Sequence, residues 1–416
     1  MNTHVKVSII IPVYNGAEFL RRSFDSAIYQ TLPEVEIIAV NDCSPNNRDA
    51  EIMRQYEKLY PYKFRALFHD VNMRQGGARN TGIRSAKGEY FLCIDQDDYI
   101  DLQMCEKMYH KAKTHNADLA ICGYGIYYKG MIKHRTPNIE VENAKISVRY
   151  KYLDCNAVWI LLVNKKFINN NELYFPCGTT SDDLIAFLWY IAANKIVRVE
   201  NTFYHWCYNP GSVSTVSDYE HFLSHSEPIE QFLNYPFWNK ISDDDRKNLS
   251  YAFIKYFSKI FVFSLWNRQI EQAKLVEIWK SNKRILQKLD IPIEGETLMK
   301  FIDDNITSPD LPKDLFRLLF FDDKRLKKRI TIFGIGVRGK RFAEFLDNIN
   351  IPFEITDNNH EHYGKTVCNK IVKPWNELKE ITDLVMVSPY AALEEVKKNI
   401  HTANIDVIDF DDLLRI

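Results

Sequence analysis

The sequence has no excess of charge of either sign. It contains 54 lysines and arginines against 55 aspartates and glutamates, which gives a formal net charge of -1. Domains that bind nucleic acid usually carry a basic surplus, so this balance argues against a nucleic acid partner. The 416 residues suffice for two or three domains, and an apolar fraction of 46% is too high for a chain that stays disordered.

The sequence also lacks close cysteine pairs and long apolar runs. None of the eight cysteines forms a C-x-x-C pair or a zinc-binding spacing, and several lie in apolar runs, where cysteine packs as a small hydrophobic residue. No apolar run reaches the roughly 20 residues of a membrane span. The first residues lead directly into a predicted strand, so we expect no signal peptide and a reduced, cytoplasmic setting.

Apolar strands and helices alternate in the first 123 residues. The predicted strands cover residues 5–13, 35–40, 64–68, 90–94 and 119–122. The predicted helices cover residues 17–31, 48–60, 76–86 and 101–116, and a later one covers 182–194. This alternation predicts a parallel sheet covered by helices on both faces, which binds ligands beyond the carboxyl ends of its strands.

The sequence predicts three parts: residues 1–217, a helical and aromatic-rich region at 218–325, and a renewed strand–helix alternation at 326–416. In the second part, 251–266 is apolar almost all round. It is either a buried helix or a helix that meets a membrane surface or a partner. The charged run 322–329 is a linker or a solvated helix end.

An acidic cluster, Asp95-Gln96-Asp97-Asp98, ends the predicted strand 90–94. Clustered carboxylates repel one another unless a cation neutralises them. Oxygen ligands of this kind suit Mg²⁺ or Mn²⁺, with nucleotide phosphates filling the remaining positions. The alternative is a solvated acidic turn. Because two other predicted strands end in polar residues at the same edge, the cluster predicts a metal–diphosphate site.

Two further segments at this edge have the chemistry of a nucleotide site. Asp42 follows the second predicted strand, where its carboxylate can accept the imide N–H of a pyrimidine; the alternative is a helix cap or turn residue. The run Gly76-Gly77-Ala78-Arg79 allows close approach of a ligand, and Arg79 can pair with phosphate. The alternative for Arg79 is a surface residue of a tight loop.

A second acidic pair, Asp182-Asp183, opens the predicted helix 182–194. The pair is either a favourable charge at a helix N-terminus or a general base held away from the metal.

Together these residues resemble the family 2 inverting glycosyltransferases, which have the GT-A fold and use nucleotide sugars. The resemblance spans residues 5–217. It rests on the order and spacing of IPVYN at 11–15, NDxS at 41–44, GGARNTG at 76–82, KGEY at 87–90 and DxDD at 95–98. It implies a mixed, mainly parallel α/β sheet flanked by helices, a Mn²⁺ or Mg²⁺ cofactor and a nucleotide-sugar donor, with UDP-sugars as the first choice.

The resemblance also implies roles for individual residues. The donor nucleotide would contact Pro12, Val13, Tyr14, Asp42, Arg79, Asp95 and Gln96. The metal would be held by Asp97 and Asp98. The pair Asp182-Asp183 matches the family's Glu-Asp pair, and we take Asp183 as the catalytic base with Asp182 as the alternative.

The sequence departs from the family at two positions. Asn41 precedes Asp42 where the family often has a second aspartate. Cys207 stands where the family often has an arginine that closes on the diphosphate. His205 or Ser212 could replace that contact, although a buried structural histidine is an equal alternative.

The last part contains G-x-G-x-x-G, with Gly334, Gly336 and Gly339, directly after a predicted strand. Asp357 ends the next predicted strand, so the pattern matches a dinucleotide-binding fingerprint. The segment resembles small Rossmann-like domains of sugar-modifying enzymes. It has no partner for hydride transfer, so a structural or assembly role, as in a homo-oligomer, is the alternative to a ligand loop.

These observations predict a metal-dependent inverting glycosyltransferase that acts on a cell-surface glycan or a lipid-linked acceptor. The glycan would be a capsule, lipopolysaccharide or teichoic acid, and the middle helices would bring the enzyme to the inner membrane face. Two alternatives stay open: an NAD-dependent nucleotide-sugar oxidoreductase that uses the C-terminal glycines, and a non-catalytic nucleotide- or glycan-binding scaffold.

Overall fold

The computed structural model describes eleven segments of the chain and six isolated residues. The segments are 4–128, 131–135, 157–176, 183–209, 238–247, 249–250, 272–289, 293–308, 328–348, 350–387 and 405–409, and the isolated residues are 233, 236, 311, 314, 396 and 400. Two compact units divide the chain. The first holds Met1–Val216 and Leu223–Ala252, and the second holds Ser217–Phe222 and Phe253–Ile416. The predicted division into three parts stays a prediction.

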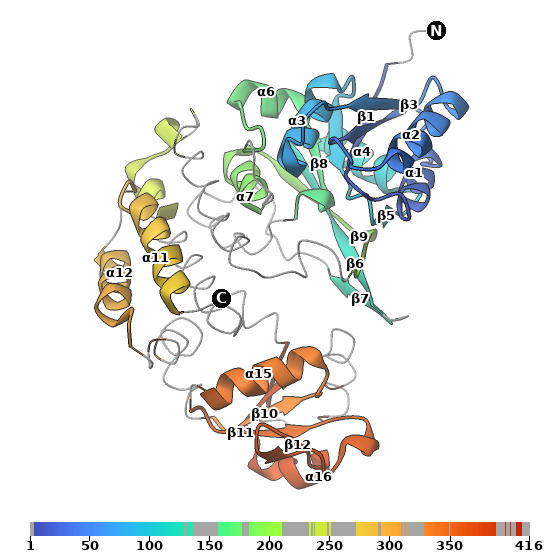
Figure 1. Ribbon diagram of the computed structural model, residues 1–416. Helices are drawn as coiled ribbons and strands as arrows, with labels where there is room; N and C mark the ends of the chain where they lie inside the picture. The colour runs from blue at the N-terminus through green and yellow to red at the C-terminus, as the bar shows by residue number, and fades with distance from the viewer. Residues whose placement is uncertain are drawn as a thin grey trace. The chain divides into compact units, whose positions relative to one another are not determined.

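A mixed sheet forms the centre of the first unit (Figure 1). Its strands follow the order β3-β2-β1-β4-β8-β6-β9-β5, with β7 paired to β6. Their bounds are β1 Val7–Val13, β2 Val35–Asn41, β3 Phe64–Phe68, β4 Tyr90–Cys93, β5 Tyr99–Ile100, β6 Leu119–Tyr128, β7 Met131–Arg135, β8 Leu161–Asn164 and β9 Ile196–Cys207. Strands β3, β2, β1 and β4 are parallel, whereas β8 is antiparallel to both β4 and β6. This confirms the predicted mixed, mainly parallel class.

Helices connect the strands of the first unit. They are α1 Leu20–Ile28, α2 Asn47–Leu59, α3 Arg74–Ser85, α4 Met104–His115, α6 Lys165–Asn171 and α7 Asp183–Ala192, and a short 3-10 turn, η2, covers Val158–Ile160. Every residue of β1 and β2 is buried, as expected for central strands covered on both faces. Helix α3 lies close against β1, because a Cβ added at Gly82 would come within 2.3 Å of the Ile10 side chain.

Strand register brings the chemically important residues to one edge. Val13 pairs with Asn41 across β1 and β2, and Ile10 pairs with Cys93 across β1 and β4. The residues that follow these strands, Tyr14, Asp42 and Asp95, therefore leave the sheet at its common carboxyl edge. The fold thus provides the ligand-binding position that parallel sheets usually have.

The described part of the second unit contains two helices and a small α/β domain. The helices α11 Gln272–Leu286 and α12 Ile293–Asn305 lie within the region predicted to be helical. The segment 251–266, whose role the sequence left open, lies outside the described residues, as do residues 322–327 of the charged run. None of the helices that the structure describes combines the length and the hydropathy needed to cross a bilayer.

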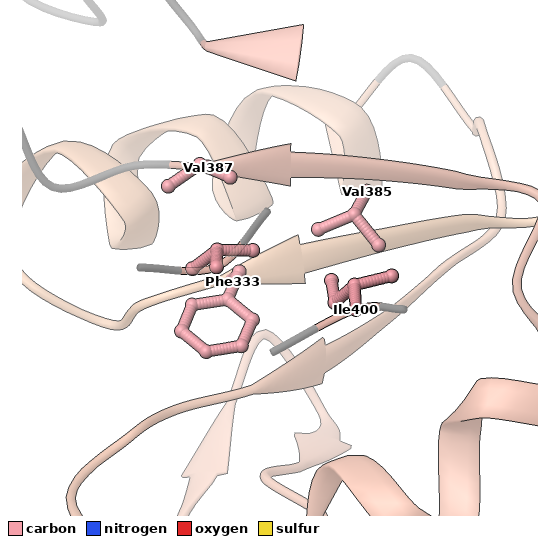
Figure 2. Close-up of a cluster of buried hydrophobic side chains, with 5 residues drawn as sticks. Phe333, Val385, Val387 and Ile400 are labelled. Carbon is pink, nitrogen blue, oxygen red and sulfur yellow. The ribbon is translucent and has the colours of Figure 1, made fainter. Parts of the chain in front are cut away.

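The small α/β domain has a four-stranded parallel sheet in the order β11-β10-β14-β15. Its elements are β10 Ile330–Phe333, α15 Val337–Asn348, β11 Phe353–Thr356, α16 Trp375–Leu378, β14 Leu384–Val387 and β15 Asp406–Asp409, with a hairpin of β12 Thr366–Val367 and β13 Lys370–Ile371. Phe333, Val385 and Val387, from β10 and β14, form a buried cluster with Val396 and Ile400 (Figure 2). The strands agree with the sequence-based prediction of a Rossmann-like domain.

Candidate active site at the carboxyl edge of the first sheet

Asp95 is held in place by α3. Arg79 donates a hydrogen bond from Nη2 to Asp95 Oδ1 over 2.7 Å, and Gln75 Nε2 donates to the same oxygen over 3.0 Å. The Arg79 side chain is 0% exposed, and its guanidinium lies 5.2 Å from the ring centroid of Phe175. The sequence predicts Arg79 beside a diphosphate. In the structure it is a buried cation that holds Asp95, and its contact with a diphosphate stays a prediction.

Asp98 faces the protein interior and is 1% exposed. Its Oδ2 accepts a hydrogen bond from Tyr204 Oη over 2.6 Å, and its Oδ1 accepts one from the backbone N–H of Cys207 over 2.7 Å. Burial raises the pKa of the Asp98 carboxyl well above its usual range, and the neighbouring carboxylates of Asp95 and Asp97 raise the pKa further. Both of its oxygens thus join the acidic loop to β9, and the assignment of Asp98 to the metal stays a prediction.

Asp97 is partly exposed, as are its neighbours Asp95 and Gln96. Its Oδ2 accepts a hydrogen bond from Asn209 Nδ2 over 3.1 Å, and its backbone carbonyl accepts one from Arg22. Among the described residues, no three His, Cys, Asp or Glu side chains gather closely enough to hold a metal ion. Within the described part of the chain, Asp97 and Asp95 are the partly exposed carboxylates of the motif, so a metal held by them would need further oxygen ligands.

Gln96 points toward the loop after β1. Its side-chain amide makes two hydrogen bonds of 2.9 Å to the backbone of Tyr14, one as acceptor and one as donor. The Tyr14 side chain itself is exposed, whereas Val13 is buried. Gln96 thus joins the acidic motif directly to the Tyr14 loop, which the sequence assigns to the donor nucleotide.

Asp42 lies at the end of β2 and is buried. Its Oδ1 accepts hydrogen bonds from the backbone N–H of Met73 and from His69 Nδ1, each over 2.8 Å. His69 Nε2 lies 2.9 Å from Thr81 Oγ1. The sequence motifs assign no role to His69 or Thr81. The available signal was the position of His69 directly after the third predicted strand, at the same edge as Asp42.

The residues predicted for catalysis and for diphosphate closure are only partly described. Helix α7 begins at Asp183, although the Asp183 side chain is not among those described, and Asp182 and Ser212 lie outside the described residues. His205 lies in β9 opposite Tyr99 of β5 and stacks on its ring at a centroid distance of 4.5 Å. Burial lowers the pKa of His205, so its imidazole is neutral at pH 7. This geometry favours a structural part for His205.

Cys207 cannot supply the positive charge of the arginine that the family often has at this position. Burial raises the pKa of its thiol to about 11, so the group is neutral at pH 7. Its backbone N–H, as described above, is used by Asp98. In the structure, Cys207 therefore holds the acidic loop through its backbone N–H.

The three glycines of the C-terminal motif have different surroundings. Gly334 has φ +98°, a conformation that favours glycine. Gly339 is buried in α15, whereas a Cβ added at Gly336 would meet no atom of the described residues within 4 Å. The open space at Gly336 is compatible with a ligand loop, but it does not identify a ligand.

Asp357, at the position of the ribose-binding acid of a dinucleotide site, is used by the loop itself. Its Oδ2 accepts a hydrogen bond from the backbone N–H of Ile335 over 2.7 Å, and its Oδ1 accepts one from Asn359 N–H over 2.8 Å. These hydrogen bonds hold the glycine loop at the end of β11. Because both oxygens of Asp357 already accept backbone N–H groups, the arrangement does not favour the NAD-dependent alternative.

Comparison with known proteins relates the sequence of the first unit to glycosyltransferases. The family described as Glycosyl transferase family 2 matches residues 8–174. Glycosyltransferase EpsJ of Bacillus subtilis is 28% identical over 226 residues, which are 50% of this chain and 63% of EpsJ. A poly(ribitol-phosphate) beta-glucosyltransferase of Bacillus spizizenii is 31% identical over 229 residues, which are 51% of this chain and 34% of the relative. The chain thus spans less than two thirds of the length of these curated relatives.

The solved structures give the same fold. Staphylococcus aureus TarS 1-349 in complex with UDP-GlcNAc superposes with a TM-score of 0.56 and 19% sequence identity over 75% of this chain and 87% of TarS. At this identity the likeness concerns the fold, and it matches the mixed α/β sheet described above. Residues 8–174 thus match glycosyl transferase family 2, and the first unit has the GT-A type of mixed α/β fold that the sequence motifs predict.

Proposed function

We propose that this protein is a metal-dependent inverting glycosyltransferase that transfers a hexosyl group from a UDP-sugar to a hydroxyl group of a cell-envelope glycan. The observation that carries the proposal is the meeting of Asp42, Asp95 and Asp97 at one edge of a family 2 domain, each held by its own set of hydrogen bonds. This edge is where a parallel sheet binds its ligand.

The donor base would bind at Asp42. Two donors occupy Oδ1 of this carboxylate, while among the described residues no donor lies within hydrogen-bond distance of Oδ2. Oδ2 can therefore accept the N3–H of uracil, with the exposed ring of Tyr14 as one wall of the pocket. Binding of UDP-GlcNAc by the structural neighbour TarS supports a UDP-sugar donor.

The diphosphate would lie between Asp97 and the loop after β1. The residues present fit Mg²⁺ or Mn²⁺, since Mg²⁺ is usually bound by one or two carboxylates together with substrate phosphates. A bound ion would offset the negative charge that develops on the departing nucleoside diphosphate. Within this site, Asp97 would hold the ion, Asp95 would be kept in position by Arg79, and Asp98 would support the loop from beneath.

Asp183, at the start of α7, would act as the general base, with Asp182 as the alternative. Its carboxylate would take the proton from the acceptor hydroxyl as that oxygen attacks the anomeric carbon. The C–O bond to the nucleoside diphosphate breaks on the opposite side of the carbon. One in-line displacement of this kind inverts the configuration of the sugar.

The acceptor proposal rests on the relatives. Two of them are named as poly(ribitol-phosphate) transferases, from Bacillus spizizenii and Staphylococcus aureus. We therefore propose a hydroxyl-rich envelope polymer or a lipid-linked precursor as the acceptor, reached by peripheral association with the inner membrane face. The small α/β domain would serve assembly, for example as a homo-oligomer contact.

The test is a donor screen. The purified protein is incubated with Mn²⁺ and UDP-, GDP- or CDP-sugars, and release of the nucleotide is measured with and without poly(ribitol phosphate). We expect release from one or more UDP-sugars, increased by the acceptor. Absence of UDP binding, measured by calorimetry, would contradict the proposed donor site. Binding without release for every sugar tried would favour the scaffold alternative.

A further inference from the structure

His69 joins three elements of the candidate site. It follows β3 directly, and its backbone N–H donates to Asn41 O at the end of β2 over 2.9 Å. Its ring lies between Asp42 of the β2 end and Thr81 of α3, at 2.8 Å and 2.9 Å. The His69 side chain is 10% exposed and that of Asp42 is 4% exposed. The chain Asp42–His69–Thr81 is therefore a nearly buried network behind the proposed base pocket.

The chemistry of the three groups fixes the direction of these hydrogen bonds. A carboxylate only accepts, so His69 Nδ1 donates to Asp42 Oδ1. In the neutral imidazole Nε2 is then the acceptor, and it takes the hydroxyl hydrogen of Thr81. The Asp42 carboxylate thus selects the Nδ1–H tautomer of His69, and the Thr81 hydroxyl, which can donate, holds the other side of the ring so that the N–H stays directed at Asp42.

We propose that His69 is a positioning residue that makes this site select uracil over cytosine, on the basis of the proposed function of Asp42 as the base-binding group. With His69 and Met73 both on Oδ1, rotation of the carboxylate is restricted and Oδ2 is the acceptor left for a ligand. Uracil presents N3–H, which donates to Oδ2. Cytosine presents an unprotonated N3, which places two acceptors against each other.

Loss of His69 would leave the Met73 N–H as the one described donor to Asp42. The carboxylate could then rotate, and a cytosine amino group could reach one of its oxygens. The ratio of UDP affinity to CDP affinity should therefore fall, because UDP binding is weakened more than CDP binding. A side chain that served packing alone would weaken UDP and CDP to the same extent.

The experiment measures the affinities of UDP and CDP by calorimetry in the presence of Mn²⁺, on the full chain. His69→Phe keeps a planar ring and removes the hydrogen bonds; His69→Gln retains an N–H donor. Thr81→Val removes the hydroxyl, and Thr81→Ser is its matched control because it retains the hydroxyl. We expect His69→Phe to weaken UDP about tenfold with little change for CDP. Thr81→Val should lower the ratio of UDP to CDP affinity by a smaller factor, and Thr81→Ser should have nearly the wild-type ratio. His69→Gln should have a ratio between those of the wild type and His69→Phe.

An unchanged ratio of UDP to CDP affinity in a folded His69→Phe protein would overturn the proposal. If that variant does not fold, the Thr81→Val and Thr81→Ser pair decides, because equal ratios in these two would also overturn it. A wild-type protein that binds neither nucleotide would show that the proposed donor site is wrong. If the wild type binds UDP and CDP equally well, the proposed donor site stands, but the proposal that His69 makes it select uracil is refuted.

Discussion

The side-chain amide of Gln96 is paired with the backbone of Tyr14 through two hydrogen bonds. Gln96 Oε1 accepts from Tyr14 N–H and Nε2 donates to Tyr14 O, each over 2.9 Å. The pair is packed tightly, since a Cβ added at Gly16 would lie 2.3 Å from Gln96 Oε1. The residue between Asp95 and Asp97 thus bonds to the loop that the sequence assigns to the nucleotide, so the acidic motif and this loop are directly joined.

Replacement of Gln96 by alanine should weaken UDP binding. The variant loses two hydrogen bonds and frees the Tyr14 loop, at a cost of about 1–2 kcal/mol, which corresponds to roughly tenfold in affinity. Gln96→Glu keeps the shape and the acceptor, but it sets a carboxylate oxygen against the Tyr14 carbonyl and adds a negative charge beside the proposed diphosphate, so it should weaken UDP at least as much. Calorimetric titration with UDP checks this. Wild-type affinity in Gln96→Ala would mean that the pairing has no part in donor binding.

The strands and acidic motifs of this fold could be predicted because their signal is local. The central strands β1 and β2 are buried along their whole length, and a continuous apolar run predicts such strands well. The predicted strand 119–122 was too short, since β6 continues to Tyr128 through a segment that pairs with β7 and β9. Those partners lie far away in the sequence, so a window of neighbouring residues does not contain the information.

The direction of each acidic side chain could not be predicted from the motif. Asp97 and Asp98 are neighbours of the same type, yet Asp98 turns inward because Tyr204 and the N–H of Cys207 are there to receive it. Arg79 turns inward toward Asp95 for the same kind of reason. These partners lie on β9 and in the loop after β4, and the side chain of each residue follows the tertiary contacts rather than the local sequence.

Asp97→Asn should lower the rate of sugar transfer by roughly a hundredfold or more, because a charge that holds a metal is worth several kcal/mol in the transition state. Asp98→Asn is a control for the same chemical change at the adjacent position. Since Asp98 is bonded to β9, that variant should lose stability more than metal affinity. The rate as a function of Mn²⁺ concentration and the urea midpoint separate the two effects. Full activity of the wild type in excess EDTA would refute the metal requirement.

Asp183→Asn should abolish transfer and leave UDP affinity nearly unchanged. A general base acts on the acceptor, so its loss lowers the rate of the chemical step and not the affinity for the donor. Asp182→Asn is the matched control one residue earlier. Single-turnover transfer and UDP titration on both variants decide the assignment. A parallel fall in UDP affinity would place Asp183 in the donor site, and loss of transfer in Asp182→Asn alone would make Asp182 the base.

The stability of the small α/β domain should fall as the pH drops below about 4, because the ion pair between Arg329 and Asp383 is then lost. Arg329 Nε and Nη2 donate to the two oxygens of Asp383 over 2.9 Å and 2.8 Å, and the Arg329 backbone N–H donates to Oδ2 over 2.9 Å. These hydrogen bonds from Arg329 lower the pKa of Asp383 to about 2. The pair joins the residue before β10 to the residue before β14.

The sign follows from the lower pKa in the folded state. The contribution of Asp383 is fully present above its unfolded pKa of about 3.9 and is lost as the pH falls toward 2, where the folded carboxyl takes up a proton. Solvent screens this half-exposed pair, so the effect should be modest. The melting temperature of Asp383→Asn should lie below that of the wild type at pH 5 and approach it at pH 2. Glu377→Gln, at an exposed carboxylate of α16, should track the wild type throughout. A constant difference between wild type and Asp383→Asn from pH 5 to pH 2 would show that the effect of the substitution is not electrostatic.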